Sequence, residues 1–215
     1  MASPIPEAFK DIWQPTIASW GEKLLATGEI VLTMIEQALG TEPGRLRDLT
    51  AGGPHLLGPN AANLDVLSAA GTIINAYHRD LNLLSIHGPA TYPGLRIWLR
   101  NGTSMYIKMP PGHILIQAAH QLEWLTGGLI TAGMHEVVVT AEALELRKSR
   151  QCPLRISSPC FQHVASRHPL IIIPEALAYE GLPKSVYEER LKRYPPITAG
   201  EQVRNELSAI GLARR

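Results

Sequence analysis

The sequence is poor in cysteine, in long apolar runs and in excess charge. Its two cysteines, Cys152 and Cys160, form no CxxC pair, and free thiols of this kind are typical of the reducing cytosol. No apolar run approaches the roughly 20 residues of a membrane-spanning helix, and the N-terminus lacks the basic and apolar segments of a secretory signal. A net charge of +1 gives no electrostatic basis for binding nucleic acid or an anionic membrane. We therefore expect a cytoplasmic protein without either partner.

The chain is long enough for one domain with a sizeable core, at 215 residues and 45% hydrophobic composition. Between residues 6 and 39, apolar residues recur at steps of three and four, which predicts a long amphipathic helix. Pro15 and Gly21 are expected to kink or split this helix, and Gly40 is expected to end it. Residues 174–212 are predicted to be helical again, with a capping box at Thr198 and Glu201.

Short apolar segments separated by Gly and Pro turns fill the region between these helices, about residues 54–165. Predicted strands cover residues 55–57, 72–76, 83–86, 94–99, 104–109, 113–118, 130–139 and 154–164, with a loop at 60–70 and helices at 121–126 and 141–150. Many short strands of this kind favour a sandwich or barrel of antiparallel sheets, the jelly roll among them. We find no repeats and no second domain.

His78 and Asp80 are the first candidates for chemistry. They lie two residues apart beside apolar segments that are predicted to be strands, and side chains at i and i+2 of a strand point to the same face. Two histidines and one carboxylate are the ligands of non-haem Fe(II) oxygenases. The triplet alone is a weak signal, because it occurs by chance in many proteins.

His135 is the candidate for the second imidazole ligand, because it begins an apolar, β-branched segment. A lone histidine at such a position is more often a hydrogen-bonded core residue. The nearby pairing of His78 with Asp80 favours the ligand interpretation. Gln117 is a weaker candidate to face the metal, and Asn82 or a backbone amide is expected to support Asp80. We predict that His87, His113, His120 and His163 are not ligands.

Arg155 and Ser157 also share one face of a predicted strand. A guanidinium and a hydroxyl side by side suit a carboxylate, and an arginine in an apolar strand is costly unless an anion satisfies it. A salt bridge to a local Asp or Glu is the alternative. Arg147 and Ser149 have the same spacing, but we reject them because i and i+2 diverge on a helix.

Together these residues resemble a known family. His78-x-Asp80, Pro93-Gly94-Leu95, Trp124-Leu125-Thr126-Gly127-Gly128, His135 and Arg155-x-Ser157 occur in the order found in Fe(II)/2-oxoglutarate-dependent dioxygenases, and the chain is most similar to the isopenicillin N synthase-like branch. The resemblance covers nearly the whole chain. It implies a mainly β fold, a double-stranded β-helix (jelly-roll) barrel flanked by N- and C-terminal α-helices.

The resemblance also implies a function. Fe(II) would be bound by His78, Asp80 and His135, and the co-substrate 2-oxoglutarate by Arg155 and Ser157. With O2, such an enzyme oxidises a small molecule by hydroxylation, desaturation or cyclisation and releases succinate and CO2. Family analogy favours a substrate of specialised metabolism.

Two departures from the family pattern define the alternatives. The usual region before the long helix is missing, so either the chain is truncated or a partner in a homo- or hetero-oligomer supplies that region, and the chain could then be the non-catalytic subunit of a split oxygenase. The family's Asn-x-Tyr-Pro, aligned on Pro59, becomes Leu56-x-Gly58-Pro59, which removes a tyrosine that contacts the co-substrate. This leaves open, as the alternative, an isopenicillin N synthase-like oxidase that does not use 2-oxoglutarate. A metal-free, ligand-binding jelly roll would leave Arg155 and the His-x-Asp motif unexplained.

Overall fold

The N-terminal part of the chain is helical, as the apolar spacing predicts. The computed structural model describes residues 5–179 and 183–212. A 3-10 turn over Glu7–Phe9 and α1 over Lys10–Trp13 are followed by a π-helical stretch over Gln14–Ala18 and then by α2 over Ser19–Leu39. The departure from α-helical geometry falls at Pro15, whose ring carries no N–H for the helix ladder. Gly21 lies inside α2 without breaking it, and Gly40 ends the helix in the left-handed region at φ 70°.

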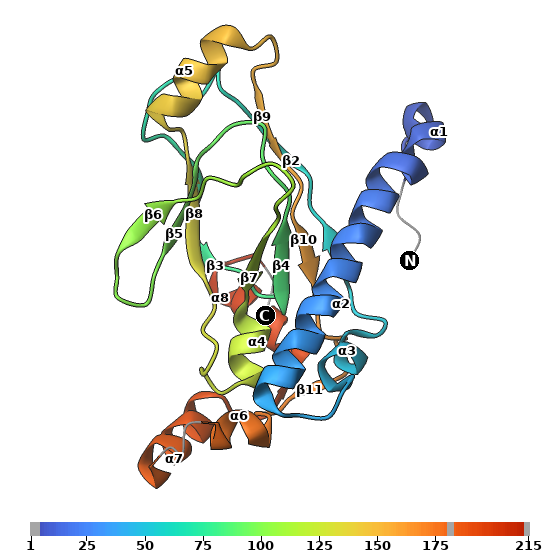
Figure 1. Ribbon diagram of the computed structural model, residues 1–215, viewed down its shortest axis with the longest axis vertical. Helices are drawn as coiled ribbons and strands as arrows, with labels where there is room; N and C mark the ends of the chain where they lie inside the picture. The colour runs from blue at the N-terminus through green and yellow to red at the C-terminus, as the bar shows by residue number, and fades with distance from the viewer. Residues whose placement is uncertain (1–4, 180–182, 213–215) are drawn as a thin grey trace.

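Helix α2 packs along one sheet of the barrel (Figure 1). Its buried side includes Leu24 and Leu32, which join the largest hydrophobic cluster together with Ile86 of the sheet. Gly28 permits the close approach, because a Cβ there would lie 2.3 Å from Oε1 of Gln162 and 3.1 Å from Cδ1 of Ile86. Burial of this apolar side holds the helix against the barrel.

Short strands follow, joined by turns and two helices. The strands are β1 (Leu56–Leu57), β2 (Asn60–Asn63), β3 (Ile73–Arg79), β4 (Leu84–His87), β5 (Leu95–Trp98), β6 (Ser104–Tyr106), β7 (Leu115–Ala118), β8 (Met134–Val138), β9 (Leu154–Ser157), β10 (Cys160–Gln162), β11 (Pro169–Leu170) and β12 (Ile197–Thr198). Helix α3 (Arg45–Thr50) lies beside α2, α4 (His120–Leu125) follows β7, and α5 (Ala141–Ser149) follows β8. The predicted hairpin around residues 100–103 is confirmed by the pairing of β5 with β6.

The paired strands form two four-stranded sheets within the described residues. One sheet has the order β1-β10-β4-β7 and the other the order β3-β8-β5-β6; β2 pairs with β9, and β11 pairs with β12. Neighbours in the sheets are antiparallel. Figure 1 shows α2 outside the first sheet and α5 at one end of the barrel, with α6 at the opposite end. This is the predicted jelly-roll architecture with flanking helices.

Several predicted strand boundaries are wrong: β3 continues to Arg79 and not to 76, β6 ends at Tyr106 and not at 109, and β8 begins at Met134 and not at 130. Residues 60–63 are not loop but strand β2, which pairs with β9 from Asn60↔Ser157 to Asn63↔Leu154. The predicted strand over 154–164 is interrupted by Ser158 and Pro159 and becomes β9 and β10, which belong to different sheets. Proline supplies no N–H to a strand ladder, so the chain changes sheet at that point.

The C-terminal part contains α6 (Pro174–Ala178), α7 (Lys184–Arg193) and α8 (Ala199–Ala209). The predicted capping box is present, since Thr198 Oγ1 accepts from the N–H of Glu201 and the Glu201 carboxylate accepts from the N–H of Thr198. Among the described residues, no helix combines the length and apolar character needed to cross a bilayer.

The packing of α2 makes a test of the fold. Leu32 is 0% exposed in the main cluster, whereas Ile30 on the same helix is 63% exposed. We expect Leu32→Ala to lower the free energy of unfolding by about 3 kcal/mol, and Ile30→Ala to change it by less than about 0.5 kcal/mol. Urea denaturation followed by circular dichroism measures both; equal losses would contradict the assigned orientation of α2.

Candidate active site

The pairing of β3 with β8 brings together residues that are far apart in the sequence. His78 and His135 are direct partners in the antiparallel register, so their side chains leave the sheet next to each other on one face. Their ring centroids are 4.2 Å apart. Asp80 lies just past the end of β3, where the N–H of His120 donates to its carbonyl oxygen at 2.9 Å and fixes the backbone.

The three predicted ligands form one cluster. Nε2 of His78 lies 3.4 Å and Nε2 of His135 lies 4.0 Å from Oδ1 of Asp80. Each residue offers one ligand atom, and the three atoms lie within 4.8 Å of one another. It is the one group of three or more His, Cys, Asp or Glu side chains with metal-binding spacing that occurs among the described residues.

Ser85 holds the carboxylate of Asp80, where Asn82 was expected. The Ser85 hydroxyl donates to Oδ2 of Asp80 at 2.6 Å, and Nδ2 of Asn82 donates to the Ser85 hydroxyl at 3.2 Å. Asn82 thus supports the carboxylate only through Ser85. The Ser85 contact could have been found from the sequence only by knowing which way β4 faces.

The pKa of Asp80 lies below its ordinary value of 3.8. Burial raises it, but the hydrogen bonds from His78 and Ser85 and the charge of His135 together outweigh burial. The hydrogen bond to Asp80 raises the pKa of His78, whereas burial lowers the pKa of His135. At neutral pH the cluster therefore contains an ionised carboxylate.

Hydrogen bonds on the far side of each imidazole orient the rings. Nδ1 of His78 lies 2.6 Å from the carbonyl oxygen of Ala76, which turns Nε2 of the same ring towards Asp80. For His135, the Gly133 carbonyl is the backbone partner, and Nε2 again faces Asp80. Metal-binding histidines usually donate their second N–H in this way.

Gln117 packs behind His135. Its Nε2 lies 3.0 Å from Nδ1 of His135 and donates to the Gly133 carbonyl at 2.7 Å. Gly133 leaves room for it, since a Cβ there would be 2.4 Å from Nε2 of Gln117. The residue therefore packs against the outer edge of the candidate ligand, the role that the sequence favours for it over facing the metal.

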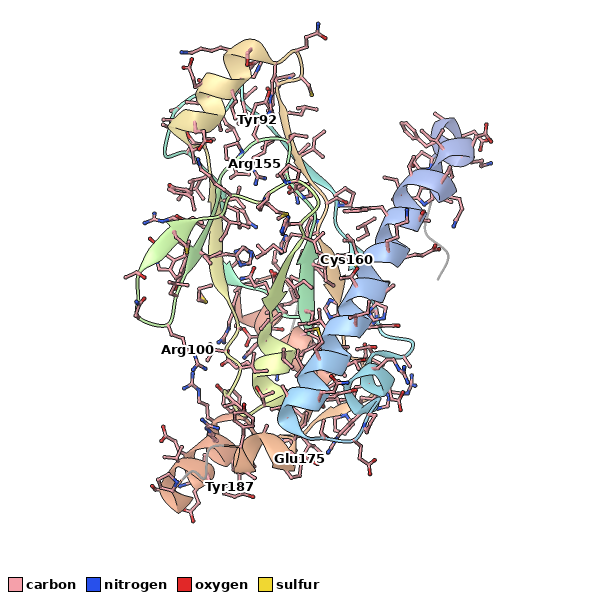
Figure 2. All side chains as sticks on the ribbon, viewed as in Figure 1. Tyr92, Arg100, Arg155, Cys160, Glu175 and Tyr187 are labelled. Carbon is pink, nitrogen blue, oxygen red and sulfur yellow. The ribbon has the colours of Figure 1, made fainter. Side chains whose placement is uncertain are left out.

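Arg155 is buried in the same region with no carboxylate beside it. It is 4% exposed, and burial lowers its pKa, although a guanidinium stays protonated at neutral pH. Within the described residues its one hydrogen bond is a long one, from Nε to the Pro93 carbonyl at 3.4 Å, and no salt bridge to it is present. The predicted alternative, a local salt bridge, is therefore not what the structure contains. Figure 2 shows Arg155 between the strands, below Tyr92 and towards α5.

Ser157 lies two residues further along β9 and lines the same cavity, as predicted from the spacing. Its hydroxyl donates to Oδ1 of Asn60 at 2.8 Å. Arg147, the rejected candidate, lies on α5 and forms an exposed ion pair with Asp65 at 2.8 Å.

One cavity of about 560 Å³ connects the cluster to Arg155. Its lining includes the five predicted site residues and also His87, which sequence reasoning set aside. His113, His120 and His163 are not part of the lining. A cavity of this size accepts a metal ion together with small organic molecules.

The donor set suits a first-row metal such as Fe(II). Two imidazole nitrogens and one carboxylate oxygen on one side of an ion leave further positions open for other ligands. The ionised Asp80 and the two Nε2 atoms directed towards it offer the donor atoms that such a metal uses. Arg155, buried without a counter-charge, suits the carboxylate of an organic acid in the same cavity.

Comparison with known proteins finds relatives that share the fold. No protein-family model matches the chain. The 1-aminocyclopropane-1-carboxylate oxidase homolog 2 of Arabidopsis thaliana is 22% identical over 199 residues, which is 91% of this chain and 48% of that protein. A 2OG-Fe(II) oxygenase family protein of Caulobacter crescentus superimposes with a TM-score of 0.77 at 24% identity, over 98% of this chain and 63% of that one. A Neurospora crassa protein solved in complex with alpha-KG gives 0.75 at 18% identity, over 97% and 62%.

These similarities show that the chain has the fold of the 2OG-Fe(II) oxygenases. The predicted double-stranded β-helix is thereby confirmed. The chain spans about half the length of the curated relative that it matches and less than two thirds of the two solved structures.

The Ser85 hydroxyl provides a test of the site's electrostatics. We expect Ser85→Ala to cost about 1–3 kcal/mol of unfolding free energy, because Asp80 loses a buried donor. A carboxyl with a lowered folded-state pKa contributes stability above its ordinary value of 3.8, and the contribution is lost as pH falls through the folded-state pKa. The difference between wild type and Ser85→Ala should therefore be full near neutral pH and shrink below about pH 4.

Ser149→Ala is the matched control, since its hydroxyl donates to a carbonyl on exposed α5. Its effect should stay within about 0.5 kcal/mol at every pH. A pH-independent difference for Ser85→Ala in denaturant titrations would mean that the hydroxyl does not act through Asp80.

Proposed function

We propose that this chain is a non-haem Fe(II)- and 2-oxoglutarate-dependent oxygenase that oxidises a small molecule. His78, Asp80 and His135 would bind the iron, and Arg155 with Ser157 would bind the distal carboxylate of 2-oxoglutarate. When bound, the iron and co-substrate supply the oxidising chemistry, in which O2 is consumed and succinate and CO2 are released. The observation that carries the proposal is a buried, uncompensated arginine in the same cavity as two histidines and a carboxylate.

The protein's own residues bind and orient. Asp80 is ionised at neutral pH, and the Ser85 hydroxyl engages its Oδ2, so Oδ1, which lies near both imidazoles, would be the oxygen that binds the ion. The Ala76 and Gly133 carbonyls orient the two imidazoles. Arg155, deep between the strands, would fix how far the acid extends from the metal, because a guanidinium binds a carboxylate through two parallel hydrogen bonds. The remaining volume of the cavity would take the substrate.

Metal and co-substrate binding are the direct test. In an anaerobic titration of the full chain with Fe(II) and 2-oxoglutarate, we expect the weak visible charge-transfer band of the chelate. His135→Ala should abolish the band, because one of three protein ligands is removed. No band with wild type, or an undiminished band in the variant, would refute the assignment.

Arg155 separates acid binding from metal binding. We expect Arg155→Leu to weaken the binding of 2-oxoglutarate by roughly 10- to 100-fold, because the acid loses a charge-assisted hydrogen-bond partner. The affinity for Fe(II) should stay within about twofold of the wild-type value. Arg147→Leu is the control, because Arg147 also lies two residues before a serine but is on the surface. It should change neither the affinity for 2-oxoglutarate nor that for Fe(II). Calorimetry measures the affinities for both ligands. A loss of metal binding in Arg155→Leu would refute the role of Arg155 as the residue that binds the acid.

An isopenicillin N synthase-like oxidase is the second candidate, and Gly58 favours it. A Cβ at Gly58 would lie 3.0 Å from the Phe161 ring, so that ring occupies the space beside the position of the family's tyrosine. In this case Arg155 would bind a carboxylate of the substrate itself. Fe(II) binding without any chelate band in the same titration would support this candidate.

The remaining proposals rest on the sequence. We propose that residues 1–215 form one oxygenase domain of a cytoplasmic enzyme of specialised metabolism; the two free cysteines support the compartment. Assembly into a homo- or hetero-oligomer, or a non-catalytic role beside an active subunit, is the alternative proposal. Size-exclusion chromatography with light scattering distinguishes them, since an active species of one chain's mass excludes both.

A further inference from the structure

His87 is directed into the barrel by the alternation of β4. Ile86 belongs to the hydrophobic cluster under α2, with its Cδ1 3.1 Å from where a Cβ of Gly28 would lie. Its neighbours Ser85 and His87 must point to the opposite face. Ser85 meets Asp80 on that face, and His87 lies one step further along it, where it lines the cavity.

The imidazole of His87 has no partner to explain its burial. Its Nε2 is fully buried and makes no hydrogen bond to any described residue. Buried polar groups are nearly always paired, because leaving one unpaired costs free energy. Nε2 of His87 therefore lacks a hydrogen-bond partner among the described residues, and a bound molecule would supply one.

The position of His87 indicates what that partner is. Its ring centroid lies 6.3 Å from that of His135, and it is not a member of the three-residue ligand cluster. Asp80, His135 and Arg155 are all near enough to affect its pKa, which burial lowers to about 4. His87 is thus a neutral imidazole with one N–H to donate, and it lines the cavity that also contains the candidate metal ligands and Arg155.

The other predicted donor for the acid is already engaged. Nδ2 of Asn60 donates to the Gly58 carbonyl, which turns Oδ1 of Asn60 towards Ser157. The Ser157 hydroxyl donates its single hydrogen to that oxygen. Ser157 must give up this bond to Asn60 in order to bind the acid, so a carboxylate at Arg155 gains from a further neutral donor that has no partner in the protein.

We propose that His87 donates a hydrogen bond to the carboxylate that Arg155 binds, and so selects 2-oxo acids with a second carboxylate. The inference rests on the proposed function and deepens it. His87 is then a specificity residue for the co-substrate, outside the metal ligands.

The test compares two acids of equal length on the full chain. 2-Oxoglutarate carries the distal carboxylate, and 2-oxopentanoate carries a methyl group in its place. Calorimetry with Fe(II)-loaded protein under anaerobic conditions measures both. We expect His87→Leu to weaken the binding of 2-oxoglutarate by roughly 10- to 100-fold. It should change the affinities for 2-oxopentanoate and Fe(II) by less than about twofold. His87→Gln, which keeps a donor, should recover most of the loss.

The controls separate the possible failures. His113→Leu changes an exposed histidine outside the cavity and should bind like wild type. Equal weakening of both acids in His87→Leu would mean a structural role and overturn the inference, as would unchanged 2-oxoglutarate binding. Either result leaves the proposed function standing. If wild type binds Fe(II) but not 2-oxoglutarate, the proposed function fails and the role of His87 fails with it.

Discussion

The antiparallel pairing of β3 with β8 is the constraint on which the candidate site depends. It places His78 directly opposite His135, so strand register alone brings the two together across the 56 residues between them. The register shifts between Ile73 and His78 show that this pairing is locally irregular, and bulges of this kind re-aim side chains. A slip of β3 by one residue would turn His78 to the outer face of the sheet, away from His135, which β5 holds in register.

A carboxylate beside two imidazoles in a barrel interior needs support from the opposite sheet. That support comes from β4 and β7, whose residues Ser85 and Gln117 are direct partners in the register. Ser85 holds Asp80 and Gln117 packs behind His135. The two sheets therefore have different roles. Strands β3 and β8 carry the two imidazoles, and the facing sheet keeps the carboxylate and one imidazole in position. Helix α2 acts only from outside, through the packing of Ile86.

The sequence predicted best what depends on local spacing. The i, i+2 pairs His78 with Asp80 and Arg155 with Ser157 are visible without tertiary information, and the helical periodicity around Arg147 was enough to reject it. Strand β2 could not be predicted, because Asn60–Asn63 has low strand propensity and is extended through its pairing with β9. Ser85 and His87 were missed for another reason. Their roles depend on which face of β4 looks inward, and this is decided by the packing of Ile86 against α2.

The separation between the candidate metal ligands and Arg155 is fixed by a short turn before β5. Gly94 has φ 142°, a conformation that favours glycine, and a Cβ there would lie 2.3 Å from the Val138 carbonyl and 3.4 Å from Nε of Arg155. The N–H of Val138 donates to the Gly94 carbonyl at 3.0 Å, and the Pro93 carbonyl accepts from Arg155. The strand that carries His135 is thereby joined to the arginine through two adjacent peptide groups. Because Pro93, Gly94 and Val138 contribute backbone atoms to this link, the barrel limits where the Arg155 guanidinium lies and therefore the distance that a bound acid must span.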